Sequence, residues 1–483
     1  MHLRFLAVGV LAVAGSCGDD GPTPPGDRVV RVELVAGDTI GLVGAVLALT
    51  ARAFDAAGAP VADPAFEWST SDTLRARVDA DGRVTLGPLA GRAVITAQSG
   101  TATDSLALRG VFEGTVKWSV TFGDSFPVIG GPALGADGTV YVLTRPRPNL
   151  REEAYLRALS PRGGLLWSTG PLDRTGANGH LVGPDGTIYV TGRTVRAFDP
   201  AGTLRWEHPL LGASAAVFIF GALTDQGTLI VAGEDSPLSL DLVTGDTVWA
   251  GPVSAFGGWL VPPTVAGPRA YLKLEEDSVF QVDLPAGALI AFVPDPDTAL
   301  DKRSFGVGPV VAGDRVYVPL AYRLAAFDTT GAQVFLTPQR GRGVAEPVIT
   351  RDGRLIVQEQ AGMRGLAPDG SQLWLAPGRR ARWSWHGGPA LATGDVLYLA
   401  TIDGFYAYNV APNNVSLRWG FQVQDGTGAN MPFTGAPVIA PDGTVYSYTD
   451  THLYAFWANR PPEPESPWPM WRRDAQRTGF VPR

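Results

Sequence analysis

The sequence predicts an all-β protein in which a small β-sandwich over residues 29–110 is followed by an eight-bladed β-propeller over residues 114–456. Gly 60 and Pro 40 in 483 residues, with 45% hydrophobic and 18% charged residues, favour short strands and tight turns over disorder. Side chains in the first region alternate in character with period two. In the second region one strand motif recurs every 39 to 48 residues, a period typical of propeller blades.

The first 17 residues have the layout of a secretory signal: a basic start, an apolar run over 5–14, and Cys17. Cys17 is the only cysteine, so no intramolecular disulfide and no cysteine-cluster zinc site can form. Residues 14–17 resemble the bacterial lipobox, which implies lipidation of Cys17; a signal peptide with a chance cysteine is the alternative. Residues 18–28 predict a flexible tether. No other apolar run reaches transmembrane length, so we expect attachment through lipid alone.

The region 29–110 predicts about seven short strands, a number that fits a β-sandwich. The Asp81-Gly82 pair marks a hairpin turn between two of them. The segments 53–55, 68–72, 82–85 and 91–97 resemble the bacterial Ig-like domain of group 2. That resemblance implies a spacer or adhesion module.

From residue 114 onward an aromatic-bearing apolar strand follows a turn eight times. Its matching positions are Tyr141, Tyr189, Ile230, Tyr271, Tyr317, Ile356, Tyr398 and Tyr446. A strand of small residues precedes most copies, as expected for the crowded innermost strand of a blade. A later strand ends in a bulky ring that we expect to dock between blades. These blade-docking aromatics are Trp118, Trp167, Trp206, Trp249, Phe335, Trp374 and Trp419.

The eighth copy lacks a fourth strand of its own, and an extra strand of that type, residues 114–120, stands before the first copy. The N-terminal strand is therefore predicted to complete the last blade and close the ring, which removes two free sheet edges.

The segments 197–206 and 240–249 resemble the pyrroloquinoline-quinone (PQQ) propeller repeat. The tail from Trp468 to Gly479 resembles a segment found next to such propellers, and residues 458–467 predict a stiff linker to it within the tail region 457–483. Members of the family that use the quinone have a pair of adjacent cysteines, which this chain cannot supply. The resemblance therefore implies a binding scaffold with no cofactor.

No other enzyme motif is found in the sequence. The mature histidines are scattered and form no metal-binding pair, and neither a nucleophile elbow nor a P-loop is present. We therefore expect no catalytic residues, no metal site and no enzyme.

Three predicted loops, linking blades 4 to 5, 5 to 6 and 6 to 7, carry seven cations and three ring side chains on one face. This candidate anion- or partner-binding face comprises Lys302, Arg303, Arg340, Arg342, Arg379, Arg380, Arg382, Trp383, Trp385 and His386. Arginine suits carboxylate or phosphate contacts, and tryptophan can stack on sugars. The alternative is ordinary charged loops, with Asp301 and Glu346 neutralising part of the charge.

The whole sequence predicts a lipid-anchored scaffold of the bacterial cell envelope, on the outer membrane, that presents a face and a central funnel to a partner. Anchor and propeller resemble the propeller lipoprotein of the β-barrel assembly machinery, from which the Ig-like domain departs. We expect a monomer whose partner is an envelope or secreted protein or a surface glycan, and no nucleic acid, because the net charge is −8. The alternatives are a carbohydrate- or surface-polymer-binding adhesin and a quinoprotein-type oxidoreductase.

Overall fold

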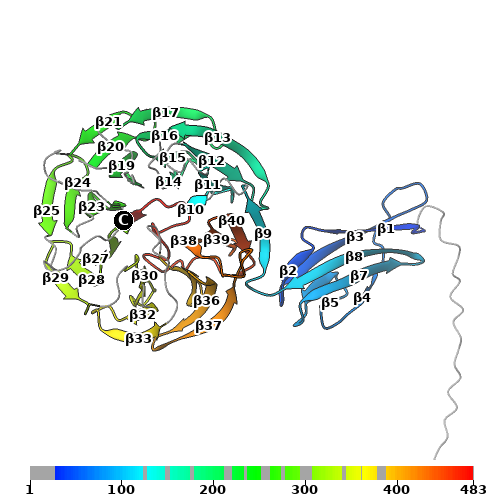
Figure 1. Ribbon diagram of the computed structural model, residues 1–483. Helices are drawn as coiled ribbons and strands as arrows, with labels where there is room; N and C mark the ends of the chain where they lie inside the picture. Colours follow the sequence, from blue (N-terminus) through cyan, green and yellow to red (C-terminus); the bar gives the residue numbers. More distant parts are fainter. Residues whose placement is uncertain are drawn as a thin grey trace, which may run out of the picture. The chain divides into compact units, whose positions relative to one another are not determined.

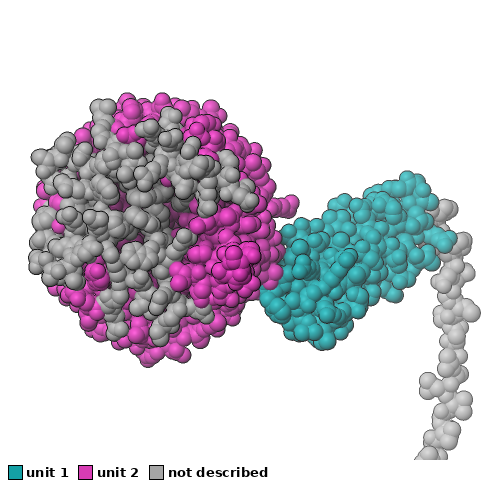
Figure 2. Space-filling view, in the orientation of Figure 1, with its two compact units in different colours: residues 1–112 teal, residues 113–483 magenta. Residues whose placement is uncertain are grey.

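The computed structural model describes residues 28–122, 128–146, 153–173, 179–210, 220–232, 237–251, 261–273, 278–293, 307–339, 344–359, 362–377 and 388–481. The chain divides into two compact units, 1–112 and 113–483 (Figures 1 and 2). The predicted signal peptide with Cys17 lies outside the described residues, as does nearly all of the tether.

The first unit is a sandwich of two four-stranded sheets, ordered β1-β3-β6-β5 and β2-β8-β7-β4. Its strands are β1 Arg31–Ala36, β2 Ile40–Leu42, β3 Val46–Phe54, β4 Glu67–Thr70, β5 Ala76–Val78, β6 Arg83–Leu86, β7 Gly91–Ser99 and β8 Ala102–Val111. Alternate residues of β6 and β7 point into one shared core, which includes Val84, Leu86 and Ile95. The assignment of this unit to the Ig-like family stays a prediction.

The second unit contains eight blade sheets, each with four blade strands, arranged as a ring (Figure 1). Blades 1 to 4 consist of β10 Val128–Leu134, β11 Val140–Thr144, β12 Glu153–Leu159, β13 Leu165–Asp173; β14 Gly179–Val182, β15 Ile188–Thr191, β16 Thr194–Phe198, β17 Leu204–Pro209; β18 Phe220–Leu223, β19 Thr228–Ala232, β20 Pro237–Asp241, β21 Thr247–Ala250; and β22 Thr264–Ala266, β23 Arg269–Lys273, β24 Val279–Asp283, β25 Leu289–Val293.

Blades 5 to 8 continue the same pattern. They consist of β26 Val310–Ala312, β27 Arg315–Pro319, β28 Leu324–Asp328, β29 Gln333–Leu336; β30 Val348–Ile349, β31 Leu355–Glu359, β32 Gly362–Leu366, β33 Gln372–Pro377; β34 Ala390–Ala392, β35 Val396–Thr401, β36 Gly404–Ala411, β37 Asn414–Phe421; and β38 Phe433–Ile439, β39 Val445–Thr449, β40 His452–Phe456 with β9 Val116–Thr121. A last strand, β41 Phe480–Val481, adds to β22 in blade 4.

The ring closes through β9, which pairs antiparallel with β40 from His452↔Thr121 to Phe456↔Val116. The N-terminal strand of the unit thus supplies the outer strand of the last blade, and the predicted closure is confirmed. Two sheet edges that would otherwise be open to solvent become paired.

The first two strands of each blade are mostly apolar, as burial on both sides of a strand favours, although β23 and β31 also bury Lys273, Gln358 and Glu359. In blade 2, every residue of β14 and β15 is buried. The all-β prediction is confirmed, and none of the described residues forms a helix long and apolar enough to cross a membrane.

Candidate functional site

The C-terminal segment, residues 457–481, lies across the middle of the propeller ring, where its trace is drawn in red (Figure 1). Its backbone carbonyls accept hydrogen bonds from the innermost strands of six blades. The donors are the N–H groups of Leu134, Val182, Leu223, Val265, Ile349 and Leu391, and the acceptors are the carbonyls of Ala475, Gln476, Thr478, Gly479, Trp468 and Pro469, at 2.6–3.0 Å.

These six donors stand at or next to the last residue of their strands, where the innermost strand turns into the hairpin to the second strand. An innermost strand has one edge without a neighbouring strand of its own sheet, and the C-terminal segment pairs with that edge. Residues 458–467, expected as a linker, take part: Glu463 N–H donates to Leu391 O at 3.1 Å, and Thr393 N–H to Pro461 O at 2.9 Å.

The apolar side chains of the segment are buried among the blades. Trp468 is fully buried in a core with Val310, Ile349 and Leu355 from blades 5 and 6. Met470 packs into the core of blades 7, 8 and 1, and Trp471 lies edge-on to Phe220 of blade 3 with ring centroids 6.5 Å apart. The segment is therefore part of the propeller core, and it fills the hairpin end of the funnel that the sequence led us to expect.

Buried charge accompanies this packing. The Arg472 guanidinium donates to the carbonyls of Gly221 and Pro263, on the inner edges of blades 3 and 4. Glu346, 1% exposed, accepts from Gly308 N–H at 2.9 Å and from Arg472 N–H at 3.4 Å. Burial raises the pKa of Glu346 and lowers the pKa of Arg472 to about 10. Glu346, named in the alternative interpretation of the charged loops, has its carboxylate buried against this segment.

Arg477 and His180 form a second buried polar group on the axis. Arg477 is 3% exposed, and its guanidinium carbon lies 4.5 Å from the centroid of the Trp471 ring. Burial lowers its pKa to about 9. His180, also 3% exposed, bonds through Nε2 to Tyr141 O at 3.0 Å. Burial, with a smaller contribution from the charge on Arg477, lowers the pKa of His180 to about 3, so the ring is neutral at physiological pH.

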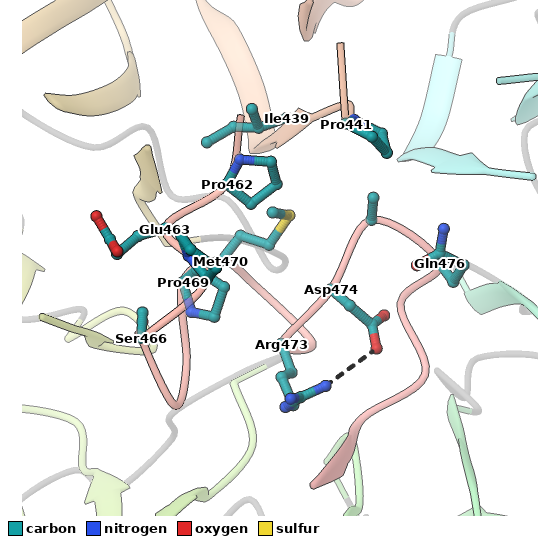
Figure 3. Close-up of a pocket in the computed structure, with 12 residues that line it drawn as sticks. Ile439, Pro441, Pro462, Glu463, Ser466, Pro469, Met470, Arg473, Asp474 and Gln476 are labelled. Atoms are coloured by element: carbon teal, nitrogen blue, oxygen red, sulfur yellow. Dashed lines mark ion pairs between the residues drawn. The ribbon is translucent and has the colours of Figure 1, made fainter. Parts of the chain in front are cut away.

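A pocket of about 220 Å³ lies between the C-terminal segment and the end of β38 (Figure 3). Four prolines and Met470 are among its lining residues, and Arg473 and Asp474 lie at one side with Nη1 and Oδ2 3.7 Å apart. Its charged groups are Glu463 and this weak ion pair, and such a lining is typical of a gap between packed turns.

Six of the seven predicted blade-docking aromatics lie against a glycine of the next blade. In five cases this glycine stands in the turn between the third and fourth strands, and in blade 8 it stands just before β9, the fourth strand. The pairs are Trp118 with Gly163, Trp167 with Gly202, Trp206 with Gly245, Trp249 with Gly287, Phe335 with Gly370 and Trp419 with Gly114. Each of these glycines has a positive φ, and a Cβ on any of them would lie 2.6–2.8 Å from a ring atom. Both the turn and the ring therefore require glycine.

Four of the tryptophans also donate from Nε1 to a carbonyl in the same turn. The bonds are Trp118 to Pro161 at 2.8 Å, Trp167 to Pro200 at 2.9 Å, Trp206 to Leu242 at 3.0 Å and Trp249 to Leu284 at 2.5 Å. The seventh ring, Trp374, differs. The matching turn of the next blade, residues 411–414, has no glycine, and Trp374 Nε1 finds no hydrogen-bond partner in the described part of the chain.

The predicted cationic face lies entirely outside the described residues, and it stays a prediction. The same holds for Cys17. Of the mature histidines, His180 is buried, His208 and His452 are partly buried, and His386 is not described. Within the described ranges no three His, Cys, Asp or Glu side chains come together as metal ligands would. Sequence reasoning missed Arg472 and Arg477; the cluster of three arginines beside two tryptophans was the available signal.

Comparison with known proteins agrees with this architecture. The family model described as "Outer membrane protein assembly factor BamB" matches residues 152–250, 191–290 and 275–474. BamB from Moraxella catarrhalis has a similar structure, with 15% identity, a TM-score of 0.54, and coverage of 71% of this chain and 99% of that chain. The computationally designed Ika8 protein is similar too, with 12% identity, a TM-score of 0.54, and coverage of 72% and 99%. No curated protein matches the sequence.

At such identities the structural likeness shows the fold alone. The family model, in contrast, matches more than half of the 483 residues, in stretches that contain the repeats, most blades and most of the C-terminal segment. The chain therefore belongs to the family of PQQ-repeat β-propellers described as outer membrane protein assembly factor BamB.

Proposed function

We propose that this protein is a non-catalytic, lipid-anchored scaffold of the bacterial cell envelope, with the propeller as a rigid platform for a protein partner. The supporting observation is the C-terminal segment, which bonds to the innermost strands of six blades. Propeller enzymes need space near the axis for a substrate, and here Trp468, Met470 and Arg472 occupy the hairpin end of it.

The chemistry of the described residues also favours binding over catalysis. The pocket of about 220 Å³ is smaller than the roughly 300–1,000 Å³ typical of small-molecule sites. A quinone cofactor of the kind the repeat name suggests does not fit: the chain has one cysteine, and no three His, Cys, Asp or Glu side chains of the described residues come together to hold a metal ion. We therefore derive no reaction step through such a group.

The family suggests the class of partner. Its model carries the name of an outer membrane assembly factor, so we propose an envelope protein as the partner and the outer membrane as the site of anchoring through Cys17. The cationic face around Arg340, Arg380 and Arg382 is the proposed contact surface, because clustered arginines suit carboxylates. The sandwich unit, absent from the matched residues, is proposed as a spacer.

The test is crosslinking in the native host followed by affinity purification and mass spectrometry. Wild type should capture a reproducible envelope protein, and Arg340→Ala/Arg380→Ala/Arg382→Ala should lose it. A matched control removes three exposed arginines from the sandwich unit, Arg83, Arg92 and Arg109, and should retain the partner.

Two results would contradict the proposal. Specific binding on a glycan array without any protein partner would establish the adhesin alternative instead. Dye-linked alcohol oxidation that depends on added quinone and calcium would establish the oxidoreductase alternative.

A further inference from the structure

The Arg477 guanidinium is almost fully buried, yet one of its edges is unused. Among the described residues, neither Nε nor Nη2 has a hydrogen-bond partner, and no carboxylate forms an ion pair with this side chain. Nε and Nη2 lie side by side on the guanidinium, where two parallel N–H groups can bind two oxygens of one oxyanion.

The backbone fixes where this edge lies. The carbonyls of Ala475 and Gln476 accept from Leu134 in β10 and Val182 in β14, at 2.8 and 2.9 Å. Arg477 follows with φ 61°, and its Nη2 lies against Gly131 of β10, where a Cβ would be only 2.4 Å away. The side chain thus runs back along the inner strands, away from the hairpin end.

His180 stands at a corresponding level of β14, two residues before Val182. Its Nε2 donates to Tyr141 O, so the neutral ring leaves Nδ1 as an acceptor, and Nδ1 has no partner in the described part of the chain. Two donors, Arg477 Nε and Nη2, and one acceptor, His180 Nδ1, therefore lie unused among the described residues along the inner strands of blades 1 and 2.

The charges around these groups do not balance at Arg477. Arg472 has the Glu346 carboxylate and two backbone carbonyls beside it, and Arg473 has Asp474 at 3.7 Å. The Arg477 guanidinium lies over the face of the Trp471 ring, and both Arg477 Nη2 and the Tyr448 ring lie close to Gly131. The Glu346 carboxylate acts on Arg477 only from beyond ion-pair distance. A buried cation without an ion-pair partner is unfavourable, and proteins normally supply an anion to it.

We propose that Arg477 and His180 bind a free hydrogen phosphate ion at the propeller axis. Two phosphate oxygens accept from Arg477 Nε and Nη2, and the P–OH group donates to His180 Nδ1. Sulfate has the same shape and no proton at neutral pH, so it cannot make the bond to the neutral ring. This site is independent of the proposed scaffold role.

The test is binding of inorganic phosphate to the full chain at pH 7.5 and constant ionic strength, measured by titration calorimetry and by the midpoint of thermal unfolding. Phosphate should bind saturably and at least tenfold more tightly than sulfate. Arg477→Gln should weaken phosphate binding at least tenfold. Arg473→Gln, the matched control in the same segment, should change it less than twofold.

His180→Gln separates recognition from folding. Glutamine can still donate to Tyr141 O, but it lacks the ring nitrogen that accepts the phosphate proton. The ratio of the sulfate to the phosphate dissociation constant should therefore fall to about one. If Arg477→Gln does not fold, equilibrium dialysis of wild type with labelled phosphate, competed by sulfate, gives the same comparison.

Equal binding of phosphate and sulfate by wild type would overturn the proposal. So would phosphate binding that survives Arg477→Gln, which would indicate an adventitious ion only. No saturable phosphate binding to wild type would show that Arg477 serves the fold alone.

Discussion

Trp468→Ala tests whether the C-terminal segment is part of the propeller core. Trp468 is 0% exposed and packs with Val310, Ile349 and Leu355 of two blades. The backbone around it is held in place, because the Trp468 carbonyl accepts from Ile349 N–H at 3.0 Å and Ser466 Oγ donates to Ile349 O. The walls around an alanine therefore cannot close the cavity it leaves.

Truncation of a buried tryptophan to alanine costs about 3–5 kcal/mol, and the fixed walls favour the upper part of that range. The unfolding entropy of the 113–483 unit, at about 2.1 cal/mol/K per residue, is about 0.8 kcal/mol/K. A loss of about 4 kcal/mol should therefore lower the midpoint of thermal unfolding of this unit by about 5 °C.

Urea and thermal unfolding of the full chain, followed by circular dichroism and calorimetry, measure this loss. Trp468→Phe keeps most of the apolar ring and should cost less than half as much. Trp68→Ala, in the sandwich core, should leave the propeller transition unchanged. A loss below about 1 kcal/mol for Trp468→Ala would refute the reasoning, because a peripheral tail has that effect.

Three further predictions concern the blade contacts, the buried histidine and the anchor. Gly202→Ala should destabilise the propeller by about 1–3 kcal/mol more than Gly227→Ala, as measured by urea unfolding. Both glycines have a positive φ, but only Gly202 lies against a ring, that of Trp167. Equal losses of stability in the two variants would exclude a role for the ring. The pKa of His180 is about 3 in the folded protein and about 6.5 in the unfolded chain, so below pH 6.5 the unfolded chain binds one more proton than the folded protein. The free energy of unfolding of wild type should therefore fall as the pH drops below 6.5, by up to about 1.4 kcal/mol per pH unit. The stability difference between wild type and His180→Gln, measured by urea unfolding from pH 7 to 4.5, should shrink accordingly, and a pH-independent difference would contradict the burial argument. Cys17→Ser should abolish fatty-acid labelling and release the protein from the membrane fraction, and retention on the membrane would disprove the lipid anchor.

Most of the propeller could be predicted from the sequence because its determinants are local and repeated. Each blade is marked in the sequence by a turn and an apolar strand such as Val140–Thr144, and seven of the eight blades also have a predicted docking ring on the outer strand. The closing strand was predictable for the same reason: Trp118 belongs to a fourth-strand motif that has no blade of its own on the N-terminal side.

The contacts of the C-terminal segment could not be predicted, because they join residues far apart in the chain. Arg472 meets Pro263 and Gly221, more than two hundred residues away, and Trp468 meets Ile349. The Pro-rich stretch 458–467 has the composition of a linker. It is held in place by backbone hydrogen bonds to the free inner edge of β34. The composition of this stretch predicts that its backbone is stiff, but it does not predict which distant strand the backbone will pair with.

Hydrogen exchange at the inner strands tests most directly whether the C-terminal segment closes the axis. The amides of Leu134, Val182, Leu223, Val265, Ile349 and Leu391 should be protected in the full chain, because each donates to this segment. In a chain that ends at residue 457, peptides with these six amides should exchange at least tenfold faster, while the amides of second strands such as β15 stay protected. Unchanged exchange of the six amides after truncation would contradict the account.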